Sequence, residues 1–65
     1  MCLSAVYKDS LAEENLLCRN IADVKFKDGK LVLTDLMGIQ KILDSTIDHV
    51  DLLENYIIIK GTGSF

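Results

Sequence analysis

An aspartate–glycine pair at residues 28 and 29 lies between two alternating runs, and it restricts the fold more than any other feature of the sequence. The run before it reads ADVKFK over residues 22–27, and the run after it reads LVLTDL over residues 31–36. An Asp-Gly pair between alternating apolar and polar residues is typical of a type I′ turn, in which both central residues need positive φ. The sequence therefore predicts an antiparallel β-hairpin centred on this pair.

Period-two alternation recurs along the rest of the chain and predicts further strands. Residues 3–8 alternate as a first strand, and residues 9–15 (DSLAEEN) are polar enough for a loop. Residues 16–26 (LLCRNIADVKF) indicate one long strand, or two with a bend near Arg19 and Asn20. The β-branched run at residues 57–59 is typical of a strand buried on both faces.

Residues 37–55 (MGIQKILDSTIDHVDLLEN) allow two interpretations. Their apolar residues fit an amphipathic helix. Alternatively, a bend lies at Met37-Gly38, and residues 39–50 alternate loosely as in a strand. Glycine and β-branched residues lower the helix propensity of this segment. We therefore expect an all-β fold, a small closed or half-closed β-barrel of five to six short strands, because closure removes exposed strand edges.

The chain is short enough to limit both its domain number and its stability. Its 65 residues predict one domain over residues 1–60, and a domain of this size buries only about 60% of the surface its unfolded chain exposes. Oligomerisation or a bound metal would add stability. Residues 61–65 (GTGSF) differ in composition and are interpreted as a flexible natural tail or a cloning remnant.

Charge and hydropathy narrow the classes of partner. The formal net charge of -3 argues against a nonspecific nucleic-acid binder, which normally needs a basic face. No run approaches the roughly 20 apolar residues of a membrane span, and the first residues lack the pattern of a signal peptide. We therefore expect a cytoplasmic protein that binds neither membrane nor, in general, nucleic acid.

Catalytic motifs are missing from the sequence. It contains no glycine-rich phosphate loop and no paired-histidine motif, and its spacing reveals no Ser-His-Asp arrangement, so we expect no enzyme. Cys18, in an apolar run, is interpreted as a packing residue. His49 is interpreted as a rim histidine or as an additional metal ligand. The aromatic side chains are core and rim residues or, alternatively, stacking platforms for RNA bases: Tyr7, Phe26, Tyr56 and Phe65.

Cys2 is the strongest candidate for chemistry, because its backbone can supply ligands as well as its side chain. With Met1 retained, the terminal amine, the Cys2 amide nitrogen and the Cys2 thiolate would hold one ion in two fused five-membered chelate rings. With Met1 removed, the Cys2 amine and thiolate would still form one such ring. Nitrogen and thiolate donors in a plane suit Ni(II), with Cu(II) as the chemical competitor. Two copies could complete the coordination with two Cys2 residues. The alternative is that Cys2 is simply an apolar residue at the start of a strand.

The chain resembles the CooT-like family of small nickel-binding accessory proteins. The resemblance rests on the opening MC before an alternating strand, on IADVKFKDGKLVLTDLMG, and on IDHVDLLENYIIIK. It implies an SH3-like β-barrel, a homodimer, and Ni(II) bound through Cys2 for the maturation of a nickel enzyme such as carbon monoxide dehydrogenase. Cys18 and the GTGSF tail match no role in the family. Because members have also been labelled predicted RNA-binding proteins on fold analogy, an RNA-binding barrel is the alternative function.

Overall fold

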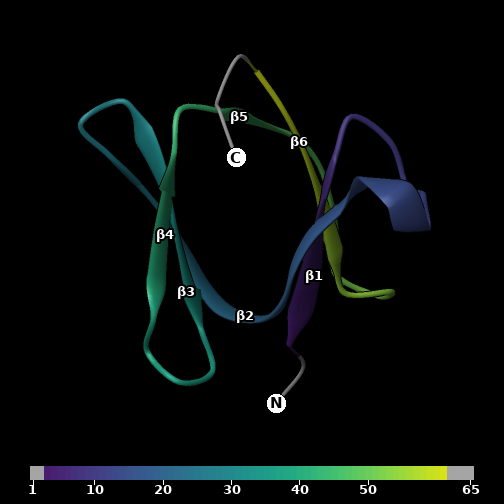
Figure 1. Cartoon of the computed structure of the whole chain (residues 1–65), viewed down its shortest axis with the longest axis horizontal. Helices are drawn as coiled ribbons and strands as arrows, with labels where there is room; N and C mark the ends of the chain where they lie inside the picture. Colours follow the sequence, from purple (N-terminus) through teal and green to yellow (C-terminus); the bar gives the residue numbers. More distant parts are fainter. Residues whose placement is uncertain (1–2, 62–65) are drawn as a thin grey trace.

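The computed structural model describes residues 3–61, which form six β-strands and one short helical turn (Figure 1). Residues 1, 2 and 62–65 lie outside the described part, and with them most of the predicted tail. The elements in chain order are β1 Ser4–Lys8, the 3-10 turn η1 Glu13–Asn15, β2 Leu16–Lys27, β3 Lys30–Asp35, β4 Gln40–Leu43, β5 Thr46–Asp51 and β6 Tyr56–Lys60.

The six strands make one mixed sheet in the order β4-β3-β2-β1-β6-β5. Neighbours pair antiparallel except β1 and β6, which are parallel. The sheet curls strongly (Figure 1), but within residues 3–61 β4 and β5 remain its two edges. The all-β expectation is confirmed, whereas the closed SH3-like barrel is not, because the sheet does not close.

Strand β2 connects the two halves of the sheet through the bend expected near Arg19 and Asn20. Asn20 has a φ of 59°, and the register of β2 shifts against β3 between Ile21 and Asp23. Such irregularities bend a strand and increase its local twist. One long bent strand, rather than two, is therefore the correct interpretation of residues 16–27.

The predicted hairpin forms between β2 and β3. Lys27 pairs with Lys30, and the two turn residues between them have φ values of 53° at Asp28 and 77° at Gly29. Both positive values fit the type I′ turn that the sequence indicates.

The amphipathic helix considered for residues 37–55 is wrong: this segment forms β4 and β5, separated by Asp44 and Ser45.

The core lies inside the curl of the sheet. Its buried side chains come from all the strands except β5: Val6, Ile21, Leu31, Leu33, Leu43, Ile57 and Ile59. Within β6, Ile57 and Ile59 are buried but Ile58 is only half-buried on the opposite face, so the prediction of a strand buried on both faces is wrong at Ile58. The described part contains no helix long and apolar enough to cross a membrane.

Candidate functional site

The predicted metal ligands Met1 and Cys2 lie outside the described residues, but the strand that follows them is paired on both sides. β1 begins at Ser4 and pairs with β2 on one side and β6 on the other. Its second residue, Ala5, donates its amide hydrogen to the Asn55 carbonyl oxygen, with an N to O distance of 3.1 Å. The backbone three residues after Cys2 is thus anchored at one end of the curled sheet.

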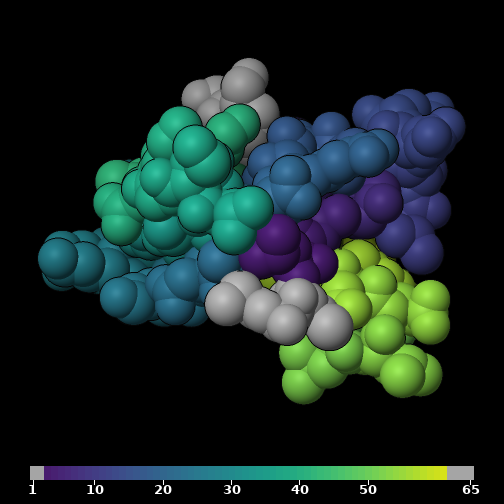
Figure 2. Space-filling model, turned by 90° about the horizontal axis from the view of Figure 1, so that it is seen from below, coloured from purple at the N-terminus to yellow at the C-terminus, as the bar shows by residue number. Residues whose placement is uncertain are grey.

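Two exposed apolar turns lie on either side of the start of β1. The β3–β4 turn and the β5–β6 turn both reach this end of the molecule, and Figure 2 shows the first residues of β1 between them. We call them the apolar turns; their exposed side chains are Leu36, Met37, Ile39, Leu52 and Leu53. Met37 is 82% exposed and Leu53 is 86% exposed. Apolar side chains gathered at one end of a small domain are typical of an interaction site.

An aspartate at the end of the preceding strand fixes each apolar turn. One carboxylate oxygen of Asp35 accepts hydrogen bonds from the amides of Met37 at 2.9 Å and Ile39 at 3.0 Å. In the same way, Asp51 accepts from the amides of Leu53 at 3.0 Å and Glu54 at 2.8 Å. Aspartate commonly stabilises turns through such bonds. The sequence interpretation missed this role, although an Asp-Leu pair precedes both turns.

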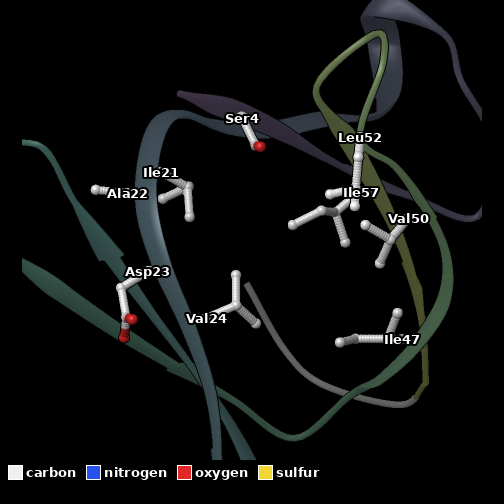
Figure 3. Close-up of a pocket in the computed structure, with 9 residues that line it drawn as sticks. All are labelled: Ser4, Ile21, Ala22, Asp23, Val24, Ile47, Val50, Leu52 and Ile57. Carbon is white, nitrogen blue, oxygen red and sulfur yellow. The ribbon is translucent and has the colours of Figure 1, made fainter. Parts of the chain in front are cut away.

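A cavity of about 330 Å³ lies inside the curl, between the bend of β2 and strands β5 and β6 (Figure 3). Its described lining is mostly aliphatic: Ser4, Ile21, Ala22, Asp23, Val24, Ile47, Val50, Leu52 and Ile57. Ser4 stands at its rim, two residues after Cys2. Such a lining suits an apolar group and does not supply a set of metal ligands.

His49 is exposed on β5, as the rim interpretation predicts. Its ring centroid lies 5.7 Å from that of Tyr56, and Tyr56 packs edge-on against Tyr7 at 6.4 Å. Within residues 3–61 no group of three or more histidine, cysteine, aspartate or glutamate side chains is arranged to hold a metal ion.

Within residues 3–61 the aromatic side chains do not form one stacking platform for RNA bases, and Phe65 lies outside the described residues. The rings of Tyr7 and Tyr56 pack edge-on against each other. Phe26 lies on the β2–β3 hairpin and does not take part in this contact. Lys60, on the strand that carries Tyr56, lies 4.0 Å from the Asp48 carboxylate. The geometry therefore does not favour the RNA-binding alternative.

Cys18 packs against the core from β2, opposite Val6. Burial raises the pKa of its thiol, the positive charge of Lys41 opposes this shift, and Asp35 adds to it. A raised pKa leaves the protonated thiol in excess at neutral pH, and the thiolate is the form that binds metal. Cys18 is thus a packing residue, as its apolar neighbours in the sequence predict.

We expect Cys18→Ala to lower the free energy of unfolding by about 1 kcal/mol and to leave nickel binding unchanged. The substitution removes a half-buried sulfur atom without adding a polar group. Urea denaturation measures the first effect, and nickel titration of the folded variant measures the second. Loss of the nickel spectrum in this variant would contradict a packing role.

The thiol of Cys18 should also react slowly with iodoacetamide. In a Cys2→Ser variant Cys18 is the single cysteine, and its raised pKa means that less thiolate is present at any pH below the folded value. The alkylation rate increases with pH as the thiolate forms. The pH midpoint of this increase should therefore be higher in the folded protein than in the same variant unfolded in urea. Coincident pH profiles would show that burial does not act on this thiol.

A family model described as "CO dehydrogenase accessory protein CooT" matches residues 1–60. The chain belongs to the CooT family. A crystal structure provisionally assigned as CooT from Carboxydothermus hydrogenoformans shares the fold, with a TM-score of 0.80 over 94% of this chain and 98% of that one, at 16% identity. A search of curated protein sequences finds no match.

Membership of the CooT family confirms the resemblance seen in the sequence. The family comprises accessory proteins of CO dehydrogenase and not enzymes, so the expectation that the chain is no enzyme is also confirmed. The match includes both apolar turns and the N-terminal residues. Residues 61–65 fall outside it.

Proposed function

We propose that this CooT protein is a cytoplasmic homodimer that binds Ni(II) through Cys2 and Met1 and stores it or delivers it to a nickel enzyme such as carbon monoxide dehydrogenase. The observation that carries the proposal is the position of β1. It begins between two fixed apolar turns at one end of the sheet, so a partner that covers the turns also meets the residues before Ser4.

The chemistry of the donors supports nickel as the cargo. The Cys2 thiolate, the Cys2 amide nitrogen and the terminal amine offer the mixed sulfur and nitrogen set that suits a tetragonal Ni(II) ion. One chain supplies few such donors, because residues 3–61 contain no other candidate group of ligands. A second copy would add its own Cys2, and a two-fold axis would bring identical residues together.

The apolar turns supply a reason for two copies to associate. Burying a leucine or methionine side chain fully stabilises a complex by roughly 1.5–3 kcal/mol, and the turns expose five such aliphatic side chains on each copy. Part of this gain offsets the loss of rotational and translational freedom on association. Because Asp35 and Asp51 already fix the turns, little backbone entropy is lost on association.

A charge placed on an apolar turn tests this arrangement. We expect Leu53→Asp to shift the protein from dimer to monomer at micromolar concentration, and to lower its nickel content in parallel. Leu11→Asp is the matched control, because Leu11 is also an exposed leucine but lies in the loop after the far end of β1. Sedimentation and metal analysis on the same samples measure both effects, with one nickel per two chains expected for the unsubstituted protein.

A dimeric Leu53→Asp variant with full nickel content would exclude the β5–β6 turn from the interface. A monomeric unsubstituted protein that nevertheless binds nickel would refute the shared site. Circular dichroism of each variant shows that the sheet is retained, so loss of folding is not mistaken for loss of assembly.

A further inference from the structure

The cavity inside the curl is open although its walls are apolar. Ile21 and Val24 face it from β2, and Ile47, Val50 and Ile57 face it from β5 and β6 (Figure 3). Val50 is 42% exposed and Ile47 is 39% exposed. An aliphatic cavity of only about 150 Å³ can bind benzene, so the 330 Å³ here have room for one aromatic ring.

Gly61 directs the chain close to this cavity after β6 ends. Its φ of +140° is one that other residues rarely adopt, and a Cβ atom there would lie 3.0 Å from the Ser45 Cα and 3.2 Å from the Asp44 carbonyl oxygen. The backbone thus passes against the β4–β5 link. Ile47, which lines the cavity, is two residues from Ser45.

The residues after Gly61 have the length and composition to fill the cavity. Phe65 is the fourth residue after Gly61, and four residues span at most about 14 Å. Ile57 lies four residues back along β6, which is about 13 Å at the rise of a strand. The intervening Thr62, Gly63 and Ser64 are small, so Phe65 is the one large apolar side chain in this stretch.

We propose that Phe65 folds back and occupies the cavity, where its ring packs between Val24 on β2 and Val50 on β5. A phenylalanine buries about 150–250 Å² of surface, and a short tether raises its effective concentration at the cavity. The family match ends at residue 60, so the filling ring is a feature of this chain beyond the shared CooT fold. The proposal does not depend on nickel binding.

A tryptophan at position 65 reports the occupancy directly, because the chain contains no other tryptophan. In metal-free protein we expect Phe65→Trp to fluoresce at shorter wavelength than Phe26→Trp, and acrylamide to quench it several-fold less efficiently. Phe26 is the matched control because it is an aromatic residue that is 55% exposed and lies outside both the cavity and the apolar turns. Equal emission maxima and equal quenching in the two variants would overturn the proposal.

A change in the cavity wall separates burial in this cavity from burial elsewhere. Val50→Ser in the Phe65→Trp background should shift the emission to longer wavelength, whereas Ile42→Ser, at an exposed position on β4 outside this cavity, should not. The spectrum should also stay unchanged on dilution to a concentration at which sedimentation shows monomers. A shift caused by Ile42→Ser alone, or a shift on dilution, would place the ring elsewhere, in the latter case on a second copy.

Discussion

Replacing Cys2 with serine is expected to abolish nickel binding and to leave the fold intact. A serine hydroxyl stays protonated at neutral pH, so the variant lacks the thiolate donor on which the proposed chelate depends. We expect affinity to fall by more than about 100-fold, since losing a group that merely orients a ligand already costs 10–100-fold. Metal analysis after gel filtration, together with the thiolate-to-nickel absorption, measures the loss.

Cys18→Ala is the matched control for this experiment, because it removes the other thiol of the chain. That thiol packs on the core and has a raised pKa, so its removal should leave the nickel absorption in place. Retention of one nickel per dimer by Cys2→Ser would contradict the proposed site. If Cys2→Ser changed nothing and the protein bound oligonucleotides in a salt-dependent manner, the RNA-binding alternative would gain support.

The parts of the fold that depend on neighbouring residues follow from the sequence. Asp28 and Gly29 define the β2–β3 hairpin because an Asp-Gly pair accommodates positive φ at both positions. The bend at Asn20 is similarly local, since asparagine tolerates a positive φ. In both cases the residues that predict the turn or bend are the residues that form it, or lie within a few positions of them.

Long-range features were not predictable in the same way. The parallel pairing of β1 with β6 joins the two ends of the chain, and alternation alone gives strands but no strand order. Between residues 39 and 50 the pattern fitted a helix or a strand, and the correct answer, two strands separated at Asp44 and Ser45, depends on pairing with β3 and β6. Tertiary context decides such segments.

In the candidate site, the sequence predicts the ligand chemistry, but only the structure shows which side chains are exposed. Cys2 is proposed from donor chemistry alone, because a cysteine beside a terminal amine and its own amide can chelate without any other residue. The apolar turns were not recognised, since Leu36, Met37 and Leu53 have the composition of core residues and only the structure shows them exposed. Their fixation by Asp35 and Asp51 also needed coordinates, because isolated aspartates are usually solvated surface residues.

The proposed donors also make nickel binding dependent on pH. Nickel must displace a proton from the Cys2 thiol, whose ordinary pKa is about 8.5, and another from the terminal amine, ordinarily near 7.7–8.0. Apparent affinity should therefore fall as the pH drops from about 8 to 6. Nickel titrations across this range measure the effect, and a flat profile would exclude both groups as ligands.

Extending the chain before Met1 should weaken nickel binding strongly or change its geometry, while folding and dimerisation remain normal. The extension converts the Met1 amine into an amide and moves the new terminus away, but it leaves the Cys2 thiol in place, so it separates the two kinds of donor. Removing the extension by proteolysis, so that Met1 is again the first residue, is the control and should restore binding in the same sample. If the extended protein binds nickel with unchanged affinity and absorption, the amine is not a ligand, and the thiolate must share the metal with backbone amides, water or His49.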